Sequence, residues 1–164
     1  TSTYIQMIEV TPASADPLDI VALEPTPDVN APVQPEQTGD IDIMEALTSN
    51  GRMVLEGLVF ETGSARLGKG PFENLTQLAE VLAASPDMRV SLVGHTDNVG
   101  NQAKNIALSQ QRAEAVRKRM VKQFEIDGAQ IDAVGVGYMA PLTSNLTASG
   151  REANRRVEVV LLSH

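Results

Sequence analysis

Residues 88–123 read MRVSLVGHTDNVGNQAKNIALSQQRAEAVRKRMVKQ, and the order of the elements within this stretch indicates the class of fold. Residues 88–94 predict a strand, because they form a short, largely apolar run that ends at a glycine. Residues 98–101 predict a loop, and the residues from Asn101 to about Gln123 predict a long helix. A strand, a short loop and a long helix in this order are typical of an α/β domain, in which helices pack against a sheet.

One face of the predicted helix turns toward the core. At about 100° per residue, seven residues fall on a face about 140° wide: Asn105, Leu108, Ser109, Arg112, Ala113, Val116 and Met120. The apolar members of this set identify the inward side, so Arg112 lies in the middle of the buried face. Burying an unpaired guanidinium is very costly, so Arg112 requires a carboxylate, supplied either by the protein or by a ligand.

Asp97 follows the predicted strand and precedes the helix, at the kind of loop where ligands commonly bind in α/β domains. Two interpretations are open from this pattern. In the first, Asp97 has a structural role: it forms an internal salt bridge with Arg112 or caps the turn. In the second, the opposite charges of Asp97 and Arg112 line a pocket. Such a pocket would suit a ligand that carries both an ammonium and a carboxylate group.

The flanking sequence continues the alternation of strands and helices. We expect a helix from Asp40 or Asp42 through Leu47, a strand over residues 53–60, and a helix that begins at Pro71 with its apolar face at Phe72, Leu75, Leu78, Ala79 and Leu82. After residue 123 we expect a strand over residues 131–136, a loop over residues 137–150 and a last strand over residues 156–162. The pattern does not reveal which neighbouring strands are parallel.

Charge divides the chain of 164 residues, whose formal net charge is −8, into two unlike parts. The first 50 residues hold nine acids, no Lys or Arg and six of the nine prolines, whereas residues 51–164 hold 12 acids and 13 bases. We therefore expect residues 1–39 to be an acidic, proline-rich linker and residues 40–164 to be the folded domain. Within the linker, residues 4–10 fit a strand and an irregular terminus equally well.

Composition also excludes several classes of function. An acidic chain without a basic tail is a poor candidate for binding nucleic acid, and no apolar run is long enough to span a membrane. The chain has no cysteine, which excludes disulfides and thiolate catalysis. His95 and His164 are the only histidines and show no spacing typical of a metal site, so we expect no metal, no cofactor and no catalytic residue.

Three motifs at characteristic distances give the chain a resemblance to a known family. They are Gly94-His95-Thr96-Asp97, the run Leu108-Ser109-Gln110-Gln111-Arg112-Ala113, and the run Gly150-Arg151-Glu152-Ala153-Asn154-Arg155-Arg156-Val157-Glu158. Together with Phe60-Glu61-Thr62-Gly63 upstream, they resemble the OmpA-like C-terminal domain, the peptidoglycan-associating module of Gram-negative envelopes. The resemblance covers about residues 53–162. It implies a two-layer β-α-β-α-β-(loop or short helix)-β sandwich with helices on a mixed four-stranded sheet.

The resemblance also implies a ligand, the meso-diaminopimelate in the peptide stem of peptidoglycan, bound without a covalent bond. The family's ligand-binding acid falls on Asp97 and its arginine on Arg112. Further members of the site fall on Asn105, Leu108, Arg155, Thr62 and Gly63. Glu61 stands where relatives often have Asp, and relatives often have Asn near Gly63, so the match is weakest in this loop.

Under this interpretation the protein tethers an outer-membrane or envelope component to the cell wall, at the periplasmic face of the outer membrane, with its anchor upstream. Two alternatives remain at this point. One is a protein-interaction module of an envelope complex. The other is a hydrolase of cell-wall peptides, which would need a nucleophile or a metal near Asp97 that the sequence does not offer convincingly.

Overall fold

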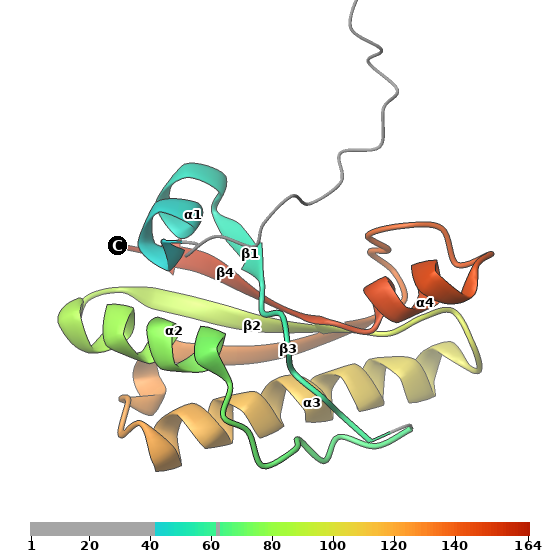
Figure 1. Cartoon of the computed structure of the whole chain (residues 1–164), viewed down its shortest axis with the longest axis horizontal. Helices are drawn as coiled ribbons and strands as arrows, with labels where there is room; N and C mark the ends of the chain where they lie inside the picture. The colour runs from blue at the N-terminus through green and yellow to red at the C-terminus, as the bar shows by residue number, and fades with distance from the viewer. Residues whose placement is uncertain (1–41, 62) are drawn as a thin grey trace, which may run out of the picture. The chain divides into compact units, whose positions relative to one another are not determined.

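The computed structural model describes residues 42–61 and 63–164, and its core is a sheet of four strands in the order β1-β4-β2-β3 (Figure 1). The strands are β1 (Arg52–Val54), β2 (Arg89–His95), β3 (Ile131–Gly137) and β4 (Val157–Ser163). The helices are α1 (Ile43–Asn50), α2 (Glu73–Ala84), α3 (Gln102–Gln123) and α4 (Ala148–Asn154), with a 3-10 turn at Gly128–Gln130.

The sheet is mixed. Strand β2 runs parallel to β3, whereas β4 lies antiparallel to both β1 and β2. Helices on a mixed four-stranded sheet are the architecture that the family resemblance implied, so the predicted fold class is confirmed.

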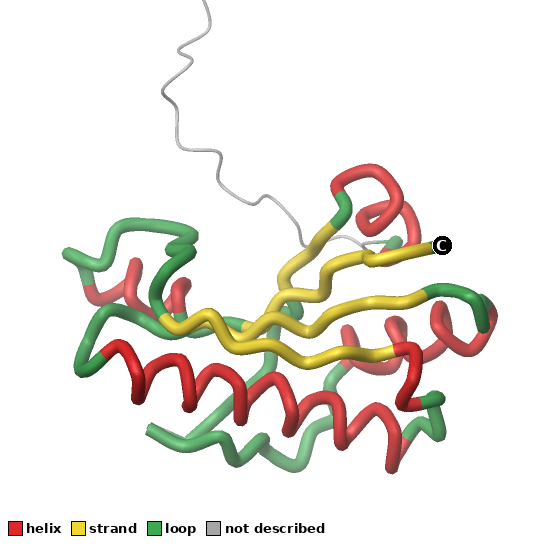
Figure 2. Tube along the Cα trace, turned by 180° about the vertical axis from the view of Figure 1, so that it is seen from behind, coloured by secondary structure: helices red, strands yellow, loops and turns green. Residues whose placement is uncertain are grey.

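Helices α2 and α3 lie beneath the sheet in the view of Figure 1, and Figure 2 shows the same two layers from behind. Their apolar faces form one core with the strands, because every second residue of a strand points to the same face. This core includes Leu75, Leu78 and Leu82 of α2, Val116 and Met120 of α3, and Val90, Leu92, Val157 and Val159 of the sheet. None of the described helices is both long enough and apolar enough to cross a membrane.

Most of the predicted elements lie where the sequence pattern placed them. Asp42, rather than Asp40, caps α1, because its carboxylate accepts hydrogen bonds from the backbone N–H groups of Met44 and Glu45. Gly51 ends this helix in the left-handed conformation. Asn101 caps α3 in the same way as Asp42 caps α1. Part of the predicted loop 137–150 and the residues after it form α4.

The strand predicted over residues 53–60 is wrong in its second half. Strand β1 ends at Val54, and Leu55 adds one further backbone hydrogen bond to Val157. The chain then turns at Gly57, which has a φ of 73°, and Phe60 forms only an isolated bridge with Leu67. The turn releases residues 58–61 from the sheet and carries them across to α3. The linker and strand predicted within residues 1–39 fall outside the described residues.

Candidate functional site

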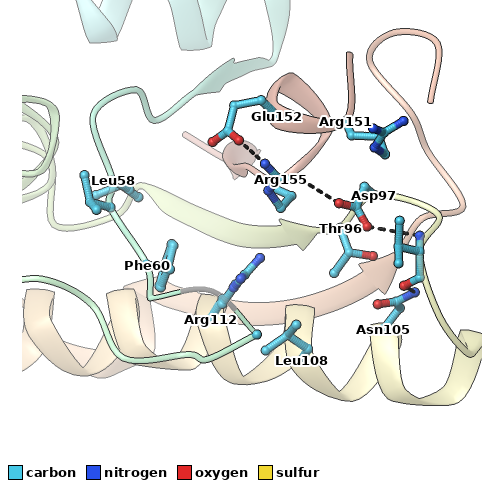
Figure 3. A pocket seen from close by; sticks show the side chains of 13 residues that line it. Leu58, Phe60, Thr96, Asp97, Asn105, Leu108, Arg112, Arg151, Glu152 and Arg155 are labelled. Atoms are coloured by element: carbon cyan, nitrogen blue, oxygen red, sulfur yellow. Dashed lines mark hydrogen bonds and ion pairs between the residues drawn. The ribbon is translucent and has the colours of Figure 1, made fainter. Parts of the chain in front are cut away.

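A pocket of about 550 Å³ opens where four parts of the chain meet: the loop after β2, the first half of α3, residues 58–60 with Gly63, and the end of α4 (Figure 3). This volume is within the range typical of small-molecule sites. The lining residues are Leu58, Val59, Phe60, Gly63, Thr96, Asp97, Val99, Asn105, Leu108, Arg112, Arg151, Glu152 and Arg155. Six of the seven predicted site residues therefore line one pocket, and the seventh, Thr62, lies outside the described residues.

Arg112 is buried in the wall formed by α3, with 5% of its surface exposed. Its Nε donates a hydrogen bond to the carbonyl oxygen of Ser64 at 3.1 Å. Its guanidinium lies over the ring of Phe60, 5.1 Å from the ring centre, a distance at which the ring face attracts a cation. Burial and, to a lesser extent, the positive charge of Arg155 lower the pKa of Arg112, while the carboxylate of Asp97 opposes this effect.

The direct salt bridge between Asp97 and Arg112, one of the two interpretations of the sequence, is absent among the described residues. Asp97 pairs with Arg155 instead, whose Nη1 donates to Asp97 Oδ2 at 2.6 Å. Helical periodicity places Arg112 on the inward face but does not show which cation reaches the acid. Arg155 reaches it because it follows the last residue of α4, beside the loop of Asp97.

Asp97 also shapes its own loop. Its Oδ1 accepts a hydrogen bond from the backbone N–H of Val99 at 3.0 Å, which is a local turn of the kind that Asp favours. The turn-cap interpretation of Asp97 therefore holds alongside its position in the pocket. The side chain keeps 14% of its surface exposed, so the carboxylate is held in place yet open to the pocket.

Asn105 and Leu108 lie on the α3 wall, as the helix face predicted. Asn105 Nδ2 donates to the carbonyl oxygen of Val99 at 3.0 Å and so ties the helix to the loop of Asp97. Leu108 is half-buried and adds apolar surface between Asn105 and Arg112 (Figure 3). On the facing wall, Gly63 has a φ of 68°, a conformation that favours glycine.

Sequence reasoning missed three charged or aromatic members of the pocket: Phe60, Arg151 and Glu152. Glu152 pairs with Arg155, which therefore bridges two carboxylates, those of Asp97 and Glu152. The spacing of Glu152 and Arg155, three residues apart at the end of a short helix, was the available signal. Phe60 lay within a quoted motif, but no sequence pattern connects it to Arg112, 52 positions later.

The lining thus carries three arginines and two carboxylates in one small space. Of the described residues, only Ser64 accepts a hydrogen bond from Arg112, and it does so through Nε. The planar end of the guanidinium is then a donor pair suited to a carboxylate. No three His, Asp or Glu side chains gather as metal ligands in the described part of the chain. The arrangement can hold a small ligand that bears both signs of charge.

The sequence of the chain is similar to that of known proteins. The model of the OmpA family matches residues 59–155. Outer membrane porin F of Pseudomonas aeruginosa is 36% identical over 99 residues, which make up 60% of this chain and 28% of the porin. The peptidoglycan-binding protein ArfA of Mycobacterium tuberculosis is 41% identical over 104 residues, or 63% of this chain and 32% of ArfA. The chain thus covers less than a third of each of these two relatives.

Solved structures agree in fold. The peptidoglycan-associated lipoprotein of Burkholderia pseudomallei matches with a TM-score of 0.59 and 30% identity, over 64% of this chain and 88% of that one. A MotB-like protein of Desulfovibrio vulgaris matches with a TM-score of 0.57 and 30% identity, over 69% of this chain and 74% of that one.

Proposed function

This chain belongs to the OmpA family, and we propose that it binds peptidoglycan without a covalent bond, through the meso-diaminopimelate of the peptide stem. The observation that carries the proposal is one pocket that presents the carboxylate of Asp97 and the guanidinium of Arg112. Two relatives whose names state an association with peptidoglycan, ArfA and the lipoprotein of Burkholderia pseudomallei, support it.

Diaminopimelate ends in a carbon that bears one ammonium and one carboxylate group, and each has a counterpart in the pocket. In the proposed complex, Asp97 accepts hydrogen bonds from the ammonium group. Arg112 and Arg155 donate to the carboxylate group, and a guanidinium matches the planar geometry of a carboxylate. Because Arg112 is already buried in the wall of the pocket, this contact needs little further loss of hydration on the protein side.

The remaining predicted residues have supporting roles in the proposal. Leu108 contacts the methylene chain of the ligand, and Asn105 holds the loop of Asp97 against α3. Gly63 lines the pocket opposite α3, and Thr62, which precedes it in the sequence, is proposed as a further ligand contact. We assign no residue a catalytic role, since the relatives cited are a porin and a peptidoglycan-binding protein, and the pocket offers charges that position a ligand.

The proposed location is the periplasmic face of the outer membrane, where this domain would tether an envelope component to the cell wall. Relatives named as an outer membrane porin and a peptidoglycan-associated lipoprotein support an envelope location. The acidic residues 1–39 are proposed to act as the spacer between the anchor and the wall, extended by proline and by mutual repulsion of the carboxylates.

Sedimentation with purified sacculi tests the site. We expect Asp97→Ala and Arg112→Ala to weaken binding by roughly tens- to thousands-fold, because removing one partner of a desolvated charge pair costs about 2–5 kcal/mol. Asp97→Asn, which keeps the shape of the side chain, should show the same loss. Asp132→Ala is the matched control, since this acid is exposed and its partner is Arg89, neither of which lines the pocket.

Two further measurements separate binding from folding and test the ligand. Thermal unfolding of each variant must remain cooperative for the loss to count. Sacculi whose peptide stems carry lysine in place of diaminopimelate lack the second carboxylate, so they should bind far more weakly. Wild-type sedimentation by Asp97→Asn and Arg112→Ala would refute the site, and equal binding to both kinds of sacculi would refute the ligand.

A further inference from the structure

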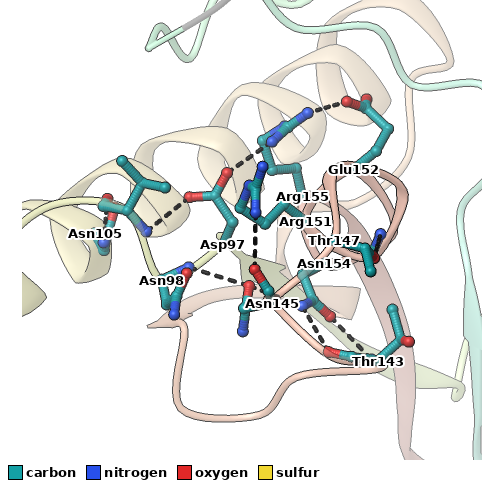
Figure 4. Close-up of polar contacts among 12 residues, drawn as sticks. Asp97, Asn98, Asn105, Thr143, Asn145, Thr147, Arg151, Glu152, Asn154 and Arg155 are labelled. Atoms are coloured by element: carbon teal, nitrogen blue, oxygen red, sulfur yellow. Dashed lines mark hydrogen bonds and ion pairs between the residues drawn. The ribbon is translucent and has the colours of Figure 1, made fainter.

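Asn145 lies outside the pocket yet contacts both of the segments that carry the pair Asp97 and Arg155. It is half-buried in the loop between β3 and α4 (Figure 4). Its Oδ1 accepts a hydrogen bond from the backbone N–H of Asn98 at 3.2 Å and another from Asn154 Nδ2 at 3.0 Å. Asn98 directly follows Asp97, and Asn154 directly precedes Arg155. One oxygen atom therefore joins the neighbours of the two paired residues.

Asn154 makes this connection firm. It is fully buried, with no exposed surface. Its Oδ1 accepts from the backbone N–H groups of Leu142 and Thr143 at 2.7 and 3.1 Å, so Nδ2 must be the donor group. Nδ2 then donates to the carbonyl oxygen of Thr143 at 2.9 Å and to Asn145. All the hydrogen-bonding capacity of this amide is used, and it has no freedom to turn away from Asn145.

The loop of Asn145 is also pressed against α4. A Cβ atom at Gly150 would lie 1.9 Å from the carbonyl oxygen of Ser144, so only glycine permits the observed approach. Thr147 caps α4 through the backbone N–H of Gly150 at 3.0 Å. Arg151, a pocket residue, donates to the carbonyl oxygen of Asn145 at 2.9 Å. These contacts fix the loop of Asn145 against α4. Because Asn145 also accepts a hydrogen bond from Asn98, the loop of Asp97 is held relative to α4 as well.

We propose that Asn145 is a positioning residue for the ligand pocket, holding Asp97 at a set separation from Arg155 through hydrogen bonds to Asn98 and Asn154. This inference rests on the proposed function, because it assigns Asn145 to the same diaminopimelate site. It predicts that a side chain with no contact to the ligand controls affinity.

Two substitutions at one position test the proposal. Asn145→Ala removes the oxygen and both hydrogen bonds, so we expect the Kd for a diaminopimelate-containing muropeptide to rise about tenfold. Asn145→Asp keeps an acceptor oxygen for both donors and should bind within about threefold of the wild type. Thr48→Ala is the control, since Thr48 donates a hydrogen bond to the carbonyl oxygen of Met44 within α1 and neither residue lines the pocket.

A second measurement needs no ligand. Without added muropeptide, NMR should show faster hydrogen exchange at the backbone N–H of Asn98 and at the guanidinium of Arg155 in Asn145→Ala, but not in Asn145→Asp. Exchange at the Leu92 amide, in the centre of β2, should remain unchanged in both. This measurement decides the positioning role even if the wild type fails to bind the muropeptide, a result that would refute only the proposed function.

The outcomes that overturn the proposal are equally distinct. Wild-type affinity and wild-type exchange in Asn145→Ala would show that the two hydrogen bonds do not position the pair. A loss of affinity in Asn145→Asp as large as in Asn145→Ala would also overturn it, because the acceptor oxygen would then not be the cause. Loss of binding with faster exchange throughout β2 would show a general structural role instead.

Discussion

His95 is a buried titratable residue two positions before Asp97. Its side chain is 4% exposed, and its Nε2 lies 3.7 Å from Oε1 of Glu158. Glu158 forms a salt bridge with Arg156, whose Nε donates a hydrogen bond to Glu158 Oε1 at 2.7 Å. Glu158 Oε2 also lies 3.5 Å from Nη1 of Arg52. Burial and then Arg156 lower the pKa of His95, and the carboxylate of Glu158 offsets part of this effect. The folded protein therefore holds His95 in its neutral form near pH 7.

This lowered pKa predicts a loss of stability in mild acid. In the unfolded chain His95 takes up a proton as the pH falls below about 6.5, while the folded protein resists protonation until a lower pH. The stability that depends on keeping His95 neutral is therefore fully present above about pH 6.5. As the pH falls below this value, the free energy of unfolding decreases by at most about 1.4 kcal/mol per pH unit. Urea unfolding between pH 8 and pH 5 should show a smaller acid loss for His95→Gln than for the wild type.

His164→Gln is the control for this experiment, because it removes a histidine at the exposed end of the chain. It should follow the wild type at every pH. Parallel stability curves for the wild type and His95→Gln would contradict the prediction, whatever the absolute stability of the variant.

The residues of the candidate site could be predicted from the sequence better than their contacts. Helical periodicity placed Arg112 and Asn105 on one inward face, and the family motifs added Arg155 and Gly63. The partner of Asp97 could not be predicted, because Arg112 and Arg155 are both cations within reach and only the end of α4 decides between them. The ring of Phe60 under Arg112 depends on the turn at Gly57, which no periodicity reveals.

At the scale of elements, the site depends on how closely α3 approaches the sheet. Two glycines permit this approach. A Cβ at Gly94 would lie 2.1 Å from the carbonyl oxygen of Ser109, and a Cβ at Gly135 would lie 2.1 Å from the backbone nitrogen of Gln110. Gln110 then bonds to β3 at both ends of its amide, donating to Ala133 O at 3.0 Å and accepting from Gly135 N at 2.7 Å.

We therefore expect Gly94→Ala and Gly135→Ala to displace α3 and to destabilise the fold. Overpacking typically costs about 1–3 kcal/mol, and the upper end applies here because the clash is with helix backbone rather than with a flexible side chain. Urea unfolding measures the loss. Since Arg112 and Asn105 move with the helix, muropeptide affinity should fall as well.

Gly68→Ala is the matched control for these two variants, because its Cβ would meet its nearest neighbour, the carbonyl oxygen of Val59, at an ordinary 3.5 Å. Its stability should match or slightly exceed that of the wild type. If all three variants unfold alike, the close approach of α3 is not the limiting contact.

The ends of elements could be predicted from the sequence where a capping residue marks them. The prediction was wrong where apolar residues continue past the end of a strand. Asp42, Gly51 and Asn101 are specific signals, and the structure uses each of them. Apart from Glu56 and Gly57, the residues from 53 to 60 are apolar. Leu55 belongs to the core, and Leu58 and Phe60 pack against it from outside the sheet. Burial of either kind selects the same residue types, so composition alone cannot separate them.

At the scale of the whole molecule, the negative charge is concentrated in the first part of the chain. Nine acids and no bases lie in residues 1–50, giving −9, and residues 51–164 add +1 to reach the net charge of −8. Within residues 42–61 and 63–164, helix α1 contributes Ile43 and Leu47 to the buried core. Six of the nine acids precede residue 40. At physiological salt, electrostatic interactions between exposed charges are largely screened beyond about 8 Å.

Two truncations test whether residues 1–39 contribute to folding or binding. A chain that begins at Asp40 keeps the cap at Asp42 and every core residue of the described part, so we expect its Tm and its muropeptide affinity to match those of the full chain. A chain that begins at Gly51 loses Ile43 and Leu47, which are 2% and 0% exposed, and should be destabilised by at least about 2–5 kcal/mol. Calorimetry and muropeptide titration of the three chains provide both readouts. A lower Tm or weaker binding in the chain that begins at Asp40 would show that the acidic segment is part of the folded, ligand-binding unit, and would move the domain boundary upstream.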